Sequence, residues 1–187
     1  MRILIASVIA ALGLQSAVAS NGIGFFGSYW NTEDSDDGFG GGAKLKIELM
    51  PGLCFEVRGS YFPDLAADED DADIDLKVIP VEGALIVELA LQEGVNIYGG
   101  GGAGYYFMHT DVEVGGVELD VGVDDEIGYF GIAGLELCIS EAVALFAEGK
   151  YTWLDIDEIE IEGLVIPLEE DIELNGFGAN AGLLIKF

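Results

Sequence analysis

Two closely spaced groups of acidic residues have the chemistry to bind metal cations. Their aspartates are Asp34, Asp36 and Asp37 in the first group and Asp68, Asp70, Asp71 and Asp73 in the second. Carboxylate oxygens are the hard ligands that Ca²⁺ and Mg²⁺ prefer, so weak binding of either ion is one interpretation. The other is a solvated surface whose charges repel one another. Neither group has EF-hand spacing, because Lys44 stands where the bidentate Glu following Asp37 would be.

Catalytic chemistry has little support in the sequence. The single histidine, His109, is followed by Thr110 and Asp111 and has no matching serine nucleophile nearby. Nothing assembles a nucleophile, a base and an oxyanion site, so we expect no enzyme. Three glycines in the segment 99–104 have the G-x-G-x-x-G spacing, but no helical pattern follows them, which argues against a phosphate-binding loop. We expect these glycines to relieve crowding in a strongly curved sheet.

The composition excludes several classes of protein. The chain has 187 residues, of which 35 are acidic and 7 basic, and 51% are hydrophobic. An acidic disordered tail would have low hydrophobicity. A net charge of −28 leaves no basic patch for nucleic acid. One histidine and two cysteines give few ligands for a zinc site, so we expect no cofactor beyond weakly bound cations.

The first nineteen residues have the organisation of a secretory signal peptide. Arg2 supplies the positive start, an apolar run covers residues 3–14, and Ala17-Val18-Ala19 is a small-x-small cleavage site. We expect cleavage after Ala19, which leaves residues 20–187 as one mature domain.

The mature chain has the pattern of strands rather than helices, because apolar residues alternate and β-branched and aromatic residues dominate. Eight strands are expected at residues 22–32, 39–49, 53–62, 74–91, 95–110, 127–139, 143–154 and 173–187. Three connections, at residues 50–52, 92–94 and 140–142, are tight. They alternate with long connections at residues 33–38, 63–73, 111–126 and 155–172. In an antiparallel meander all the tight turns therefore lie at one end and all the long loops at the other.

Acidic residues are concentrated at the long-loop end. The segments 33–37, 64–75, 111–126 and 155–173 hold 4, 7, 7 and 9 of them, which is 27 of the 35. The loop end is therefore intensely negative. The alternation continues into the long loops, where we expect the strands to continue into water as hairpins, with Gly115-Gly116 as a tight turn.

Each strand has an apolar face and a face that carries charges. In the segment 53–61, for example, Phe55 and Val57 alternate with Glu56 and Arg58. The charged face comprises Lys44, Lys46, Glu48, Glu56, Arg58, Glu82, Glu88, Glu136, Glu148, Lys150 and Lys186. Such charges can pair across a closed lumen, while the apolar face then requires an apolar solvent outside. Pro80, within the fourth strand, is expected at a β-bulge, which leaves the facing of Lys77 and Glu82 open.

This inside-out pattern is typical of a transmembrane β-barrel, whose sheet must close because lipid cannot satisfy an open edge. Aromatic residues near the long-loop ends support an interfacial girdle. They are Tyr29, Trp30, Tyr61, Tyr105, Phe107, Tyr129, Tyr151, Trp153 and Phe177. Side chains fill the interior of an eight-stranded barrel, so we expect no wide pore.

The two cysteines, Cys54 and Cys138, share the inner face near the tight turns. Their strands, the third and the sixth, lie nearly opposite one another, and a disulfide needs Cα atoms closer than about 7 Å. We therefore favour two unpaired lumenal thiols. A disulfide is the alternative, because an exported protein meets an oxidising compartment.

Several segments resemble the small eight-stranded outer-membrane barrels of the OmpA, OmpX and opacity type, often called porin-family barrel domains. They are residues 97–106, residues 131–137 with Ser140-Glu141, residues 145–151 and the ending from Gly182 to Phe187. The resemblance covers residues 20–187 and implies an eight-stranded antiparallel up-and-down barrel with short periplasmic turns and long outer loops. The extreme acidity of the outer loops in this sequence is a departure from that family. The resemblance also implies residence in the outer membrane of a Gram-negative-type cell, contact with its lipid, and a terminal Phe187 that the barrel-assembly machinery recognises.

The function we expect is structural, or an interaction at the cell surface. The acidic loops would meet cations, a host surface or a basic partner, and nucleic acid is excluded. Two alternatives remain open from the sequence. One is a narrow ion-conducting channel of the porin type, and the other is a soluble, secreted Ca²⁺-binding barrel.

Overall fold

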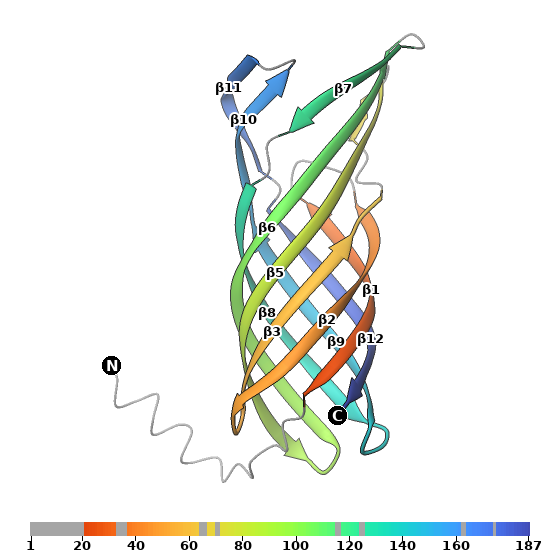
Figure 1. The fold of residues 1–187 in the computed structure, drawn as a ribbon, viewed down its shortest axis with the longest axis vertical. Helices are drawn as coiled ribbons and strands as arrows, with labels where there is room; N and C mark the ends of the chain where they lie inside the picture. Colours follow the sequence, from red (N-terminus) through yellow and green to blue (C-terminus); the bar gives the residue numbers. More distant parts are fainter. Residues whose placement is uncertain are drawn as a thin grey trace, which may run out of the picture.

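The computed structural model describes residues 21–32, 37–63, 67–69, 72–114, 117–123, 126–161, 164–173 and 175–187, which form strands joined by turns (Figure 1). The wall strands are β1 (Gly22–Thr32), β2 (Gly38–Met50), β3 (Leu53–Tyr61), β5 (Ala72–Gln92), β6 (Val95–Val114), β8 (Glu126–Cys138), β9 (Val143–Trp153) and β12 (Gly176–Lys186). Among the described residues, no helix is long and apolar enough to cross a membrane. The predicted signal peptide lies outside the described residues.

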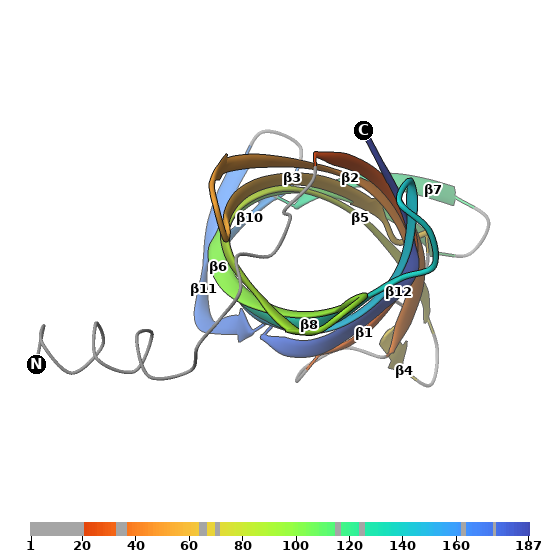
Figure 2. The same cartoon turned by 90° about the horizontal axis from the view of Figure 1, so that it is seen from below.

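The eight wall strands close into a barrel in which every pairing is antiparallel. Their order around the ring is β1, β2, β3, β5, β6, β8, β9 and β12. Strand β12 pairs with β1 from Gly22 opposite Lys186 to Thr32 opposite Gly176, so the first and last strands close the ring (Figure 2). The closed up-and-down barrel expected from the sequence is confirmed.

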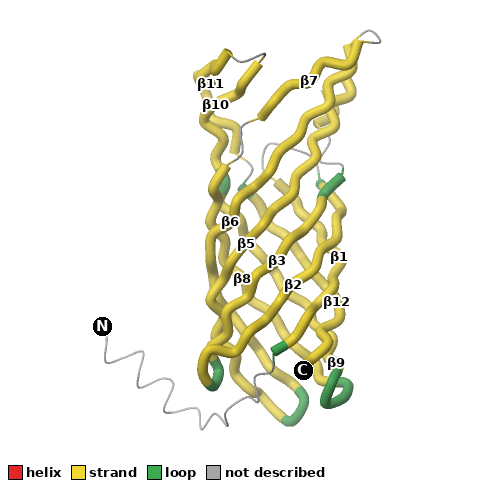
Figure 3. The backbone as a smooth tube through the Cα atoms, viewed as in Figure 1, coloured by secondary structure: helices red, strands yellow, loops and turns green. Residues whose placement is uncertain are grey.

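Short turns gather at one end of the barrel, as the alternation of connections predicts (Figure 3). The chain reverses at Pro51-Gly52, at Glu93-Gly94 and between β8 and β9. Gly52 and Gly94 have φ values of +79° and +76°, a left-handed conformation that favours glycine. The predicted strand positions agree with the wall strands, apart from β6, which continues to Val114.

Four further strands extend the sheet beyond the opposite end. They are β4 (Ala67–Glu69), β7 (Val117–Val123), β10 (Asp155–Ile161) and β11 (Leu164–Glu173) (Figure 1). Val114 of β6 lies opposite Val117 of β7, which is the hairpin expected around Gly115-Gly116, although these two glycines lie outside the described residues. The strands therefore continue past the wall into the acidic segments.

The outward face of the wall is apolar along its length. Phe25 is 56% exposed, Leu85 53% and Ile185 50%, whereas the residues between such positions are buried in the lumen. This large apolar surface belongs in lipid. The soluble secreted barrel, kept open as an alternative, is therefore wrong, because it would turn this face inward.

Pro80 does not lie at a β-bulge, contrary to the expectation. It stands in regular register opposite Tyr106 of β6, and the irregularity of that ladder lies between Ala90 and Gln92. On the other side, the ladder with β3 ends at Val81 and resumes as a single bridge between Phe62 and Val78. Proline has no N–H to donate, so the ladder with β3 is interrupted there while the register with β6 stays regular.

Candidate functional site

Charged side chains from six wall strands converge in the lumen. The buried ones are Lys44, Lys46, Glu56, Arg58, Glu82, Glu88, Glu136, Glu148 and Lys150. Lys186 joins them through its ion pair with Glu136 at 2.5 Å. Glu48, the eleventh residue expected there, is half-buried at the turn end, and no ion pair of the described residues includes it. The structure thus brings together ten of the eleven residues.

A four-residue cluster occupies the middle of the lumen. Arg58 contacts Glu56 and also Glu148, with 2.6 Å between Nη1 and Oε1. Lys44 lies 3.2 Å from a carboxylate oxygen of each glutamate. All four side chains are at most 3% exposed, so each charge depends on the others for the solvation that water would otherwise supply.

Two uncharged residues outside the expected charge network complete this cluster. Tyr98 donates from its hydroxyl to Glu148 at 2.7 Å, and Asn180 donates from its amide to the same carboxylate at 2.9 Å. Both side chains occupy inward-facing positions of their strands, so the alternation that located Glu148 in the lumen also places these two residues there. They satisfy the remaining lone pairs of a buried carboxylate.

A second cluster lies toward the turn end. Lys46 bridges Glu136 at 2.7 Å and Glu88 at 3.1 Å, and Asn96 donates to Glu88 at 2.8 Å. The ammonium of Lys186 also lies 2.9 Å from the Cys138 sulfur. A cavity of about 10 Å³ separates this cluster from the central one, which is room for a single water molecule at most.

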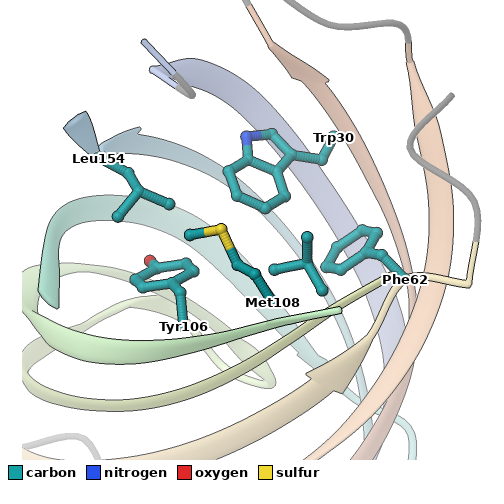
Figure 4. Packing of buried hydrophobic residues seen from close by; sticks show 6 residues of the cluster. Trp30, Phe62, Tyr106, Met108 and Leu154 are labelled. Carbon is teal, nitrogen blue, oxygen red and sulfur yellow. The ribbon is translucent and has the colours of Figure 1, made fainter. Parts of the chain in front are cut away.

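Toward the loop end, an ion pair adjoins a buried apolar cluster in the lumen. Lys150 and Tyr106 both approach Oε1 of Glu82 at 2.7 Å. Tyr106 also belongs to the apolar cluster, here called the plug, which comprises Trp30, Phe62, Val78, Tyr106, Met108 and Leu154 (Figure 4). Trp30 is 1% exposed, so its placement in the outer aromatic girdle is wrong: its parity on β1 points it inward.

The lumen is electrically balanced. Its five cations are Lys44, Lys46, Arg58, Lys150 and Lys186, and its five carboxylates are Glu56, Glu82, Glu88, Glu136 and Glu148. These ten described residues therefore contribute nothing to the net charge of −28 that the chain carries.

The glycines of β6 allow close approach between strands rather than phosphate binding. A Cβ at Gly100 would come 2.1 Å from the carbonyl of Leu85, and one at Gly102 would come 1.8 Å from the carbonyl of Gly83. Gly99, Gly101 and Gly104 lie in the same strand, which runs on to Val114 without a helix.

The candidate cation ligands are only partly described. Asp37 is exposed and accepts hydrogen bonds from the Tyr29 hydroxyl at 2.5 Å and from the Asn31 amide. These donors hold the pKa of the Asp37 carboxyl below its ordinary value. Asp34, Asp36, Asp70 and Asp71 lie outside the described residues. For Asp68 and Asp73 only the backbone is described, and it places them opposite one another on β4 and β5.

Where side chains are described, no group of three His, Cys, Asp or Glu residues could hold a metal ion. The backbone register nevertheless places acidic residues opposite one another above the wall. Asp111 of β6 stands opposite both Asp75 of β5 and Asp120 of β7. Like charges at directly opposed positions disfavour strand pairing unless something neutralises them.

The remaining residues singled out from the sequence lie apart from one another. Cys54 is fully buried and Cys138 half-buried, and both thiols are free, as the favoured interpretation has it. His109 lies in β6 opposite Lys77, and its side chain is outside the described part of the chain. Phe187 is 71% exposed, and its backbone N–H donates to Asn21.

Comparison with known proteins identifies the same architecture. A family model described as "Outer membrane protein beta-barrel domain" matches residues 4–185. The outer membrane protein OprG of Pseudomonas aeruginosa has a TM-score of 0.69 at 16% identity, over 93% of this chain and 99% of that one. Neisserial surface protein A scores 0.60 at 19% identity, over 89% and 96%. Ail of Yersinia pestis scores 0.55 at 16% identity, over 90% and 97%. No curated protein matches the sequence.

Proposed function

Because this chain belongs to the outer membrane protein β-barrel domain family, we propose that it is a sealed barrel whose acidic extracellular loops bind divalent cations and a basic surface partner. Its place is the outer membrane of a Gram-negative cell. The filled, charge-balanced lumen carries the proposal, because it leaves the loops as the part of the molecule with unneutralised charge. The proposal assigns no catalytic step to the barrel.

The loop carboxylates support a role for divalent cations. Twenty-seven of the 35 acidic residues fall in the four long connections. Where the backbone is described, Asp75, Asp111 and Asp120 stand opposite one another on adjacent strands. Ca²⁺ or Mg²⁺ bridging opposed carboxylates would relieve their repulsion and order the strands that extend beyond the wall. The ligands we propose are Asp34, Asp36, Asp37, Asp68, Asp70, Asp71 and Asp73.

The sign of the loop charge also indicates the class of partner. The similar barrel Ail has been solved with the heparin analogue sucrose octasulfate, a polyanion. The long connections of this chain carry the same sign of charge as that ligand, so we expect a basic partner here. A host or neighbouring surface rich in lysine and arginine fits this charge.

Export and insertion follow the usual route for such a barrel. We propose that residues 1–19 are removed after Ala19, and that the assembly machinery recognises the terminal Phe187 with its alternating apolar residues.

The test is calorimetric titration of the purified barrel with Ca²⁺ and, separately, with oligolysine. In the loop variant, Asp68, Asp70, Asp71 and Asp73 are replaced by Asn. The matched control replaces Glu93 and Glu141, exposed at the turn end, by Gln. We expect weak binding of both probes that falls in the loop variant and persists in the control. Equal binding by the loop variant and the wild type, or none by the wild type, would overturn the proposal.

A further inference from the structure

The sulfur of Cys138 and the side-chain nitrogen of Lys186 are in contact at the turn end of the lumen. Nζ of Lys186 lies 2.9 Å from the Cys138 sulfur and 2.5 Å from Oε1 of Glu136. The two residues are 48 positions apart in the chain and belong to β8 and β12. A thiol and a primary amine held against one another are the two reactants of an oxidative cross-link, which is chemistry that the ion pairs of the lumen do not use.

The register of three strands explains how the two side chains meet. In the ring, β9 lies between β8 and β12. Ala144 of β9 stands opposite both Cys138 and Leu184, and Lys186 follows two residues later on the same face of β12. Strands that are two apart in a sheet lie about 9.5 Å from one another. This separation is too large for a disulfide, but the four-carbon stem of a lysine spans it. Because Ala144 carries only a methyl group, no larger side chain stands between sulfur and nitrogen.

Packing and backbone hydrogen bonds hold both reactants in position. The backbone N–H of Cys138 donates to the Gly94 carbonyl at 2.8 Å. The backbone N–H of Lys186 donates to the Ala142 carbonyl at 2.8 Å, where the last strand ends beside the turn between β8 and β9 (Figure 3). The Cys138 side chain also packs against a buried cluster of Phe26, Ala144, Phe146 and Leu184. Neither residue has to move far to react with the other.

The other thiol, Cys54, has a different environment. It is completely buried, and the polar contact described for its sulfur is the Glu88 carboxylate at 3.9 Å. Cys138 is half-buried and directly precedes the turn at residues 139–142. A small oxidant that arrives from the turn end therefore reaches Cys138 first, and the oxidised sulfur meets an amine rather than a second thiol.

We propose that Cys138 and Lys186 form a modification site at which a peroxide creates a covalent sulfur–nitrogen bond between β8 and β12. Hydrogen peroxide oxidises the thiol to a sulfenic acid: the O–O bond breaks, an S–O bond forms and one water leaves. Glu136 accepts a proton from the Lys186 ammonium, and the resulting amine attacks the sulfur. The S–N bond forms as the S–O bond breaks, and the hydroxyl leaves as a second water with another proton from the nitrogen. The sulfur loses two electrons, which the peroxide gains, and a thiol reductant reverses the bond.

The bond fastens the strand that closes the barrel. Strand β12 pairs with β1 at the seam, and the cross-link joins it to β8 as well, across 48 positions of the chain. A covalent loop of this kind restricts the unfolded chain, so the oxidised barrel resists unfolding more than the reduced barrel. The site is independent of the cation role proposed for the acidic loops, which lie at the opposite end.

The test is intact-mass spectrometry of the detergent-purified barrel before and after treatment with hydrogen peroxide, followed by peptide mapping. The cross-link lowers the mass by two hydrogen atoms, whereas a sulfenic acid adds one oxygen. Lys186→Arg keeps a positive charge beside Glu136 but removes the nucleophilic amine, and Cys138→Ser removes the site. Cys54→Ser is the matched control, because it removes the other thiol and with it any disulfide within the chain. Heat-modifiable mobility on a gel verifies that each variant is folded.

We expect peroxide to produce the cross-linked species in the wild type and in Cys54→Ser, with a peptide that joins Cys138 to Lys186. Lys186→Arg should gain oxygen at Cys138 and form several-fold less of the species that lacks two hydrogens. The urea midpoint of the wild type should rise on oxidation and return on reduction with dithiothreitol, whereas that of Lys186→Arg should not respond.

Oxygen addition to the wild type without loss of hydrogen would overturn the proposal. A loss of two hydrogens that disappears in Cys54→Ser would also overturn it, since that result identifies a disulfide. If Cys54→Ser does not fold, the peptide map of the wild type alone decides whether Lys186 or Cys54 is joined to Cys138.

Discussion

Arg58 of β3 and Glu148 of β9 are 90 positions apart in the chain, yet Nη1 and Oε1 lie 2.6 Å apart across the lumen. Their strands are not neighbours in the ring, so this contact joins opposite parts of the wall. It belongs to a cluster from which water is excluded, and its removal should therefore have a large effect.

Arg58→Ala should destabilise the barrel by about 3–5 kcal/mol, because it leaves Glu56 and Glu148 buried with one cation, Lys44, between them. The measurement is urea unfolding in lipid vesicles. Glu48→Ala is the control, since this residue lies outside the lumenal ion pairs and should change stability little. The double variant Arg58→Met with Glu148→Met should be more stable than Arg58→Ala. Wild-type stability of Arg58→Ala would contradict the role of the cluster.

Removing the Trp30 side chain from the plug should destabilise the barrel. Trp30→Ala should cost about 3–5 kcal/mol through loss of packing against Phe62 and Tyr106. Trp30→Phe should cost much less, because among the described residues the indole nitrogen has no hydrogen-bond partner to lose. The same unfolding experiment compares the two variants. An equal loss in both would show that the indole nitrogen has a partner.

The sequence alone predicts which side chains face the lumen, because charged residues such as Glu56 and Arg58 alternate with apolar residues on short, regular strands. The tight turns were predictable for a related reason, since Gly52 and Gly94 mark left-handed backbone. These local signals located the wall strands and ten of the eleven lumenal charges.

The pairing of the charges could not be predicted in the same way. Which carboxylate Arg58 meets across the lumen depends on the tilt and stagger of the closed wall, which no single segment encodes. Trp30 was misplaced because its aromatic type suggested the girdle although its parity pointed inward. Pro80 was misplaced because its missing N–H interrupts only the β3 ladder.

The sealed lumen that we propose predicts that the barrel does not conduct ions. In planar lipid bilayers the wild type should give no discrete conductance steps, because the plug and the central charge cluster occupy successive levels of the lumen. Conductance steps whose size changes in Glu148→Gln or Lys150→Met would instead establish the narrow channel that the sequence left open.

Asp37, at the loop end of the barrel, should have a lowered carboxyl pKa. Hydrogen bonds from Tyr29 and Asn31 lower the pKa of this carboxyl, so its contribution to stability is complete above the ordinary Asp pKa and is lost as the pH falls through the lowered value. NMR titration of the Asp37 carboxyl should show the lowered pKa, and Tyr29→Phe should raise it. An unchanged pKa in Tyr29→Phe would contradict the hydrogen bond.

The two thiols should differ in reactivity. Cys138 is half-buried near the turn end, whereas Cys54 is completely buried. A small maleimide should therefore label Cys138 in the folded barrel and both thiols after unfolding. The single variants Cys54→Ser and Cys138→Ser assign the label. Absence of labelling after unfolding without reductant would reveal a disulfide.

The seam between β1 and β12 has a consequence for biogenesis. Because Gly22 pairs with Lys186 and Thr32 with Gly176, the wall cannot close until the last strand has been exported. Asn180 and Lys186 both lie on β12, so their contacts with Glu148 and Glu136 in the lumen form only when this last strand is in place. Before then the chain has two open sheet edges, which are prone to aggregation. Folding dominated by such distant contacts is slow, so the unfinished chain needs escort through the periplasm for as long as its two ends remain apart.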